Sequence, residues 1–189
     1  MNVRSNKKHR VFETTLKLIA EHGLHNTPMS LVSKRSGIST GAIYHHFESK
    51  EVLINELYLF VKQEIMNNIF DDVTAELNYK ESFHKIWSNY FHYLIKNQDI
   101  LSFVEQCSIS PIIKEQTRME AQKLAIPLID FITEGTQKNF LINNEIELIL
   151  AIINGNVITV AKLHISKLLP INKEIENKAI QTSWKGLSQ

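Results

Sequence analysis

Polar and ring-bearing side chains lie beside two very small residues in one short stretch near the N-terminus. This stretch contains Ser39, Thr40, Gly41, Ala42, Tyr44, His45, His46 and Lys50. Its hydroxyl, phenol and imidazole groups donate and accept hydrogen bonds, and its glycine and alanine let a backbone approach another molecule closely. Such groups read base edges in the major groove of DNA, which admits an α-helix. Because a serine at a helix start and a lysine are suited to phosphate, the stretch predicts contact with a nucleic acid.

Two short helices joined by a tight turn are expected to present this stretch. Thr27 and Pro28 are typical of a helix start, because threonine caps a first turn and proline needs no partner there for its missing N–H. That helix is expected to end by Gly37, and Ser39 to cap a second helix over about residues 40–47. A glycine-containing turn between two such helices predicts a helix-turn-helix, which presents the start of its second helix to bases.

The distribution of charge favours the same interpretation. Residues 1–50 have a net charge of +5, from eight basic and three acidic side chains, whereas the remaining residues have a net charge of −4, from 13 basic and 17 acidic ones. A basic N-terminal part, residues 1–50, before a mildly acidic remainder indicates that this N-terminal part binds a polyanion. A solvated basic tail is the alternative.

The residues from Arg10 to Leu53 also carry a family motif. The central string is Gly37-Ile38-Ser39-Thr40-Gly41-Ala42-Ile43-Tyr44-His45-His46-Phe47-Glu48-Ser49-Lys50-Glu51-Val52-Leu53. It is similar to the signature of the tetracycline-repressor (TetR) family, in which a first helix precedes a helix-turn-helix containing G-[VI]-S-x-G-x-[LI]-Y-x-[HY]-F-x-[SN]-K-x-x-L. The resemblance covers about 45 residues, and the whole string makes it highly specific.

The resemblance implies which residues meet double-stranded DNA. They are Ser30, Thr40, Gly41, Ala42, Tyr44, His45, His46 and Lys50, and the residues themselves add Thr27 and Ser39 as candidates. Ser30 would face a phosphate or a base, but serine is shorter than the polar residues that family members often carry there, so a base contact is not expected. Histidine changes charge near pH 6.5. If His45 or His46 lies against phosphate, binding should tighten as the pH falls, whereas neutral or packed rings would show no such effect.

The rest of the chain predicts an all-α protein of about nine helices. Apolar-periodic runs lie at residues 8–22, 28–36, 40–47, 50–70, 81–96, 100–107, 110–134, 145–169 and 173–185. Pro127 is expected to kink the seventh run, and Gly135 to follow its end. Residues 1–50 are expected to form the DNA-binding domain, with its helix-turn-helix at about 28–47. By resemblance, residues 51–189 look like the family's helical effector-binding and dimerisation domain.

The helix expected at 145–169 is apolar on nearly every face. A helix that packs on one side only has no need of this, so the pattern favours a helix between its own core and a second copy, while an ordinary central core helix is the alternative. The resemblance implies a homodimer built on the last two long helices. The candidate dimer residues are Ile149, Ile153, Val157, Val160, Ala179 and Trp184. The apolar run 148–161 is too short to span a bilayer, so no membrane association is expected.

An aromatic-rich region in the body suggests a pocket for a small apolar or amphipathic effector, as the family often has. Its candidate residues are Phe60, Trp87, Tyr90, Phe91, Phe103, Gln106 and Cys107. Aromatic residues at helical spacing also form ordinary core, and this alternative stays open. Cys107 lacks neighbouring basic residues in the sequence, so a structural role is favoured over redox sensing.

Enzyme, metal and cofactor signatures are absent from the sequence. It has no glycine-rich phosphate loop, no Gly-x-Ser-x-Gly elbow and no His-Glu-x-x-His, so no catalytic residue or cofactor is expected. The adjacent histidines of a helix point in different directions and are not expected to share a metal ion. A polar, basic start without an apolar run predicts no secretory signal, and a single cysteine suits the cytoplasm.

The family resemblance thus predicts a dimeric transcriptional regulator, by family default a repressor, that an effector releases from a palindromic operator. One alternative is a regulator whose body binds a protein partner and no small ligand. The other is an all-helical enzyme or carrier, which would show no salt-dependent DNA binding.

Overall fold

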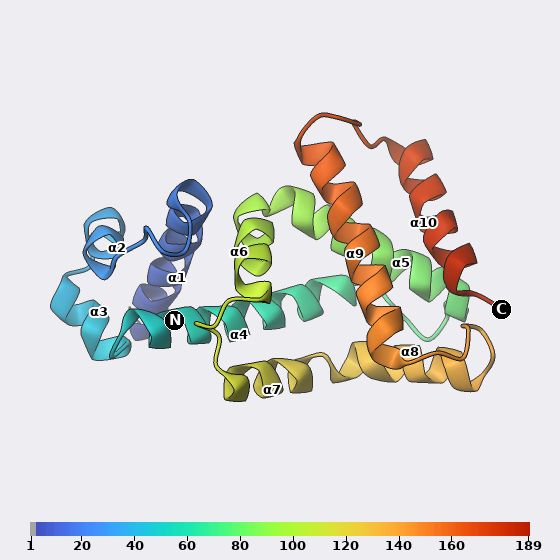
Figure 1. The fold of residues 1–189 in the computed structure, drawn as a ribbon, viewed down its shortest axis with the longest axis horizontal. Helices are drawn as coiled ribbons and strands as arrows, with labels where there is room; N and C mark the ends of the chain where they lie inside the picture. The colour runs from blue at the N-terminus through green and yellow to red at the C-terminus, as the bar shows by residue number, and fades with distance from the viewer. Residues whose placement is uncertain (1–2) are drawn as a thin grey trace. The chain divides into compact units, whose positions relative to one another are not determined.

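The computed structural model describes residues 3–189, with side chains from residue 7 onward, as ten α-helices (Figure 1). The helices are α1 (Val3–His22), α2 (Met29–Ser36), α3 (Thr40–His46), α4 (Lys50–Ile69), α5 (Tyr79–Lys96), α6 (Gln98–Ser108), α7 (Glu115–Leu124), α8 (Ile126–Gln137), α9 (Ile146–Ile165) and α10 (Lys173–Leu187). Within this range the extended structure is limited to one isolated bridge, so the predicted all-α class is confirmed. The first two residues of the basic N-terminal segment lie outside the described residues.

The tenth helix arises at Pro127, where one kinked helix was expected. The chain ends α7 at Leu124 and begins α8 at Ile126, with the proline in the first turn of α8. A proline inside a helix removes one hydrogen bond and clashes with the preceding turn, whereas the first turn tolerates it. The expected helix start at Ser110 is also wrong, because turns precede α7.

Gly135 lies inside α8 and does not follow the helix end, as was expected. A Cβ atom at this position would lie 2.0 Å from the hydroxyl oxygen of Tyr79, so the glycine permits a close approach of α5 to α8. Tyr79 stacks on Phe131, with ring centroids 4.4 Å apart, and donates a hydrogen bond to the Phe131 carbonyl. The glycine therefore serves packing between helices and not helix termination.

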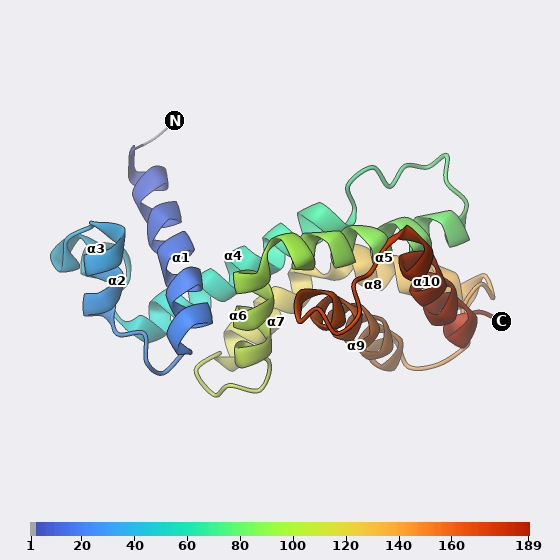
Figure 2. The same ribbon diagram turned by 90° about the horizontal axis from the view of Figure 1, so that it is seen from above.

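The chain divides into two compact units. One contains residues up to 61 together with 98–121, and therefore α1 to α3, the first part of α4, α6 and most of α7. The other contains residues 62–97 and 122–189. In the second unit, α5 packs against α9 and α10, and α8 packs against α9 (Figures 1 and 2).

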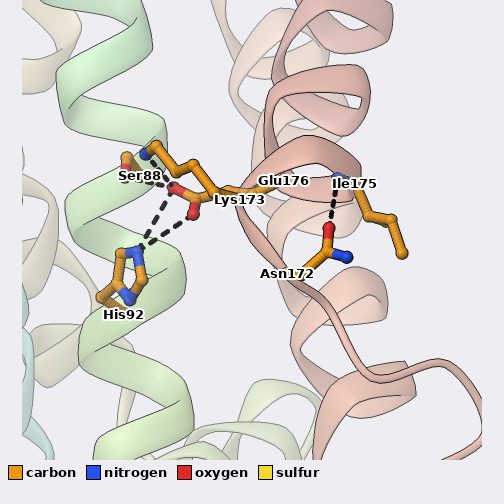
Figure 3. Close-up of polar contacts among 6 residues, drawn as sticks. All are labelled: Ser88, His92, Asn172, Lys173, Ile175 and Glu176. Atoms are coloured by element: carbon orange, nitrogen blue, oxygen red, sulfur yellow. Dashed lines mark hydrogen bonds and ion pairs between the residues drawn. The ribbon is translucent and has the colours of Figure 1, made fainter.

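A buried carboxylate joins α10 to α5 (Figure 3). Glu176 is only 3% exposed; Ser88 Oγ donates to it at 2.5 Å, His92 Nε2 lies 3.2 Å from both of its carboxylate oxygens, and Lys173 Nζ lies 3.3 Å away. Burial raises the pKa of this carboxyl, but the hydrogen bond from Ser88 and the charges of His92 and Lys173 outweigh it and lower the pKa below its ordinary value. The carboxylate is thus held in its ionised form at the helix interface.

Candidate nucleic-acid interface

The helix-turn-helix forms as the local signals predict. α2 ends at Gly37, whose φ of +67° lies in the left-handed region that favours glycine. The Ala42 N–H then donates to Ser39 Oγ at 3.3 Å, so the predicted serine cap of α3 is confirmed. Two helices of eight and seven residues are therefore joined by a turn of three residues.

A small core and one arginine hold α3 and α2 on α1. Ile43 and Phe47 are fully buried, and the Phe12 ring of α1 lies 5.6 Å from the Phe47 ring. The Arg10 guanidinium donates to the Ser36 carbonyl, at 2.7 Å from Nε. Because that carbonyl stands at the end of α2, Arg10 satisfies a group that the helix itself leaves unpaired. α1, α2 and α3 thus form one braced head.

Most of the predicted DNA-contacting side chains lie at the surface of this head. The exposed residues are Ser30, Ser39, Thr40, Gly41, Tyr44 and His45, and the half-buried ones are Ala42, His46 and Lys50. Tyr44 is 47% exposed, which is unusual for an aromatic ring. The small residues at the start of α3 leave its backbone open, since nothing lies within 4 Å of a Cβ built at Gly41. This surface has the geometry of a recognition helix.

Thr27 does not belong to this surface, which corrects two expectations. The residue is 1% exposed, and its hydroxyl donates to the Gly23 carbonyl at 2.9 Å. The N-cap position of α2 falls on Pro28, without a side-chain cap. The threonine hydroxyl closes the turn after α1, so it neither caps α2 nor faces DNA.

Lys50 has a structural role besides the predicted contact with phosphate. Its ammonium group donates to the carbonyls of Leu24, at 2.6 Å, and His25, at 3.2 Å. Partial burial lowers the pKa of this lysine. An ammonium has three donors, so these two bonds leave one for a phosphate.

The predicted pocket residues fall in both compact units, and their polar groups are already in use. Gln106 bonds to backbone groups at the end of α1, and the Tyr90 hydroxyl donates to Asn154 Oδ1 at 2.8 Å. Contact of Gln106 with a ligand stays a prediction, because its amide is bonded to the protein itself in this structure. The amide is a structural link between α6 and α1.

The apolar members of that set are core residues of their own units. The fully or almost fully buried residues are Trp87, Phe91, Phe103 and Cys107. The Trp87 and Phe91 rings stack, with centroids 5.8 Å apart. Phe60 is half-buried against Phe12. Burial, opposed by the charge of Arg118, raises the pKa of Cys107 to about 12, which keeps the thiol neutral and favours its structural role.

Three of the six predicted dimer residues face inward. Ile149, Ile153 and Val157 are buried in their own unit, so the expectation that they meet a partner is wrong. Val160, Ala179 and Trp184 are half-buried, and the Trp184 ring packs on the Phe83 ring of α5 at 5.2 Å. On α8 and α9, the exposed large apolar residues are instead Ile126, Leu148 and Ile152. Sequence reasoning missed these three, because α9 is apolar on nearly every side and its pattern does not mark an outer face.

α9 also meets the length and hydropathy of a membrane span, with a mean hydropathy of 1.7 and 22% of its apolar window buried. One such helix is weak evidence, because core and interface helices share this composition. The outer side of α10 is polar. Its exposed residues include Glu174, Asn177, Lys178, Thr182 and Lys185. The exposed side of α10 is therefore polar, which favours α9 over α10 as the apolar part of an interface.

An exposed, serine-capped helix on a braced helix-turn-helix defines the class of helix-turn-helix DNA-binding proteins. Comparison with known families agrees. The family described as "Bacterial regulatory proteins, tetR family" matches residues 11–57, and the "Tetracyclin repressor-like, C-terminal domain" matches residues 78–188. The second match covers more than half of the chain, which therefore belongs to the TetR family of bacterial regulatory proteins.

Similar proteins are transcriptional regulators. An uncharacterized HTH-type transcriptional regulator of Haemophilus influenzae is 26% identical over 106 residues, which is 56% of this chain and 57% of that protein. The Fatty acid metabolism regulator protein of Bacillus subtilis is 25% identical over 140 residues, 72% of each protein. The crystal structure of a tetR family transcription regulator from Shewanella sp. PV-4 shares the fold, with a TM-score of 0.88 at 24% identity over 97% of this chain and 98% of that one.

Proposed function

We propose that this chain is a transcriptional regulator that binds a palindromic operator as a homodimer, with α3 of each subunit in the major groove. The observation that carries this proposal is the exposed face of α3, where Tyr44 and His45 stand outward while Ile43 is fully buried beneath them. Residues 1–50 act as the DNA-binding domain, and Ser30, Ser39, Lys50 and the start of α3 contact the operator. The protein acts in the cytoplasm, as a regulator and not as an enzyme.

The dimer would form through α8 and α9. Exposed large apolar side chains on a water-soluble chain are typical of interaction sites. Ile126, Leu148 and Ile152 are 49%, 46% and 38% exposed. Dimer interfaces are enriched in such residues at their centre. A second copy on these helices would remove the most apolar helix of the chain from water.

The body would bind a small apolar or amphipathic effector that releases the operator. The support is the family itself and the relative named as a fatty acid metabolism regulator. Release requires an effector that binds the DNA-free state more tightly than the DNA-bound state. A body that binds a protein partner instead is the second candidate, and a screen of fatty acids and other amphipathic compounds for operator release distinguishes the two.

Fluorescence anisotropy tests the central proposal. The probe is DNA from just upstream of the gene that encodes this chain, or a site recovered by selection from random DNA. We expect tight binding that weakens steeply between two salt concentrations, because released counterions drive it. Tyr44→Ala should weaken binding by about tenfold or more, as expected when a recognition contact is lost.

Ile109→Ala is the matched control, because Ile109 is 93% exposed in the same compact unit but lies outside the helix-turn-helix. Equal effects of the two variants, or the failure of selection to recover any site, would contradict the proposal.

A further inference from the structure

The backbone at the end of α1 is held by a side chain from a distant helix. The Leu24 N–H donates to Gln106 Oε1 at 2.8 Å, and Gln106 Nε2 donates to the Ile19 carbonyl at 3.3 Å. Ile19 and Leu24 stand on either side of the helix terminus at Gly23, whose φ is +82°. One amide on α6 thus bonds to a donor after that terminus and to an acceptor before it, which also accepts from the Gly23 N–H at 2.8 Å.

The side chain of Lys50 also binds this segment of the backbone, residues 19–25, which we call the α1 corner. The carbonyls of Leu24 and His25 accept hydrogen bonds from Lys50 at the start of α4. Ser102 accepts a further bond from Gln106 Nε2 at 3.0 Å and orients the amide on α6. The α1 corner is therefore tied to α4 by a lysine and to α6 by a glutamine.

The position of the α1 corner determines the position of the recognition helix, α3. α1 carries the arginine that holds the end of α2 and the phenylalanine that packs under α3. Because the head is braced in this way, a shift of α1 on α6 would move α3 with it. Both bonds from Gln106 to the α1 corner are directional, so they restrict its rotation on α6.

We propose that Gln106 is a positioning residue for operator recognition. Its amide fixes the α1 corner on α6 and so limits the orientations that α3 can take. In a dimer, this restriction determines how sharply the protein discriminates between operators that differ in half-site spacing. The inference rests on the proposed dimeric binding to a palindrome, and it assigns to Gln106 a role that needs no contact with DNA or effector.

Gln106→Met tests the inference, because methionine has a similar length and removes all three hydrogen bonds of the amide. Anisotropy would measure binding of the unmodified and variant proteins to the selected operator, to versions with one or two base pairs added or removed between half-sites, and to an isolated half-site. We expect the preference for the best spacing to fall by about fivefold, the size of effect that one or two lost hydrogen bonds produce. Affinity for the half-site should change less than about twofold, because α3 itself is intact.

Gln116→Met is the matched control. Gln116 is exposed on α7, and its amide donates to Glu120 on its own helix. This control should keep the full spacing preference. Gln106→Glu is a second variant, which keeps the acceptor for the Leu24 N–H but loses the donor to the Ile19 carbonyl. It should also reduce the preference, and it keeps the test available if Gln106→Met does not fold.

Two results would overturn the inference while leaving the proposed function in place. One is an unchanged spacing preference in folded Gln106 variants. The other is an equal loss of affinity for every operator spacing and for the half-site, together with a lower melting temperature. This result would mean that Gln106 only stabilises the fold. If the unmodified protein bound no selected site at all, the proposed function would fail, and the inference with it.

Discussion

His45 and His46 stand at the end of α3, where the surface proposed to meet DNA carries an exposed phenol and two imidazoles. Their rings are 5.7 Å apart, and His46 lies next to Phe47 of the core. The nearest charged residues along the chain are Glu48 and Lys50 after α3, and Lys34 and Arg35 stand at the end of α2. Two neighbouring imidazoles near a polyanion can couple proton uptake to binding.

We therefore expect operator affinity to rise as the pH falls from about 8 to about 6, since a phosphate favours the cationic form of histidine. The expected rise is about three- to tenfold, below the linkage limit of about tenfold per pH unit for each proton taken up. Anisotropy at constant salt measures it. A double variant, His45→Gln with His46→Gln, should lose most of this pH dependence. Operator affinity that does not change with pH in the unmodified protein, or an equal rise in the double variant, would contradict the expectation.

The helix α10 is attached by polar contacts as well as by apolar packing. Two of its four buried residues, Glu176 and Ser183, are polar, and Ser183 Oγ has no hydrogen-bond partner among the described residues. The carboxylate of Glu176 is bonded by side chains of α5 and by Lys173 of its own first turn. The attachment of α10 to α5 should therefore depend on the ionisation of one carboxyl group.

The lowered pKa of Glu176 determines the sign of its effect on stability. The folded state favours the ionised form of this carboxyl group. Its ionisation therefore stabilises the folded state at pH values above the unfolded pKa of about 4.3, and this stabilisation is lost as the pH falls through the pKa of the folded state. We expect Glu176→Gln to reduce the free energy of unfolding at pH 7 by about 1–3 kcal/mol, as for a lost hydrogen bond to a buried charge. Urea unfolding at pH 7 and in acid measures the free energy of unfolding of the unmodified protein and of Glu176→Gln. The difference between them should become smaller in acid.

Glu174→Gln is the control for this comparison. Glu174 also lies in the first turn of α10, but its side chain is 73% exposed and pairs with Lys178. Such exposed pairs contribute little to stability. Two results would argue against a specific role of the buried carboxylate. One is an equal loss of the free energy of unfolding in the two variants, and the other is a loss in Glu176→Gln that does not change with pH.

At the scale of the whole molecule, the exposed apolar side chains of α8 and α9 determine the expected assembly. We expect Leu148→Glu with Ile152→Glu to convert the dimer into a monomer, because two charges would be buried at the centre of the interface without partners. Sedimentation velocity at micromolar concentration measures the assembly. Affinity for the palindrome should fall together with the dimer, whereas affinity for a half-site should persist.

Leu168→Glu is the control for the assembly experiment. Leu168 is 80% exposed in the connection between α9 and α10, outside the two helices proposed to pair. It should leave the assembly unchanged. A dimer that survives the double substitution, or one that Leu168→Glu disrupts, would show that another surface joins the subunits.

Local signals determined the head of this protein from the sequence alone. The left-handed glycines at the ends of α1 and α2 and the serine cap of α3 all act within a few residues along the chain. Their physical causes are helix termination and the pairing of free N–H groups, and neither depends on distant parts of the chain. The family motif covers this same region, so the class of the protein and most of its candidate contacts were predictable.

Only the tertiary structure decided where polar side chains and apolar faces point. The hydroxyl of Thr27, the amide of Gln106 and the carboxylate of Glu176 each find partners that their own neighbours in the sequence do not reveal. α9 is apolar on nearly every side, so its periodicity could not show which residues face the core and which face outward. Such choices depend on which helices meet across long sequence separations, and helical spacing within one element carries no information about them.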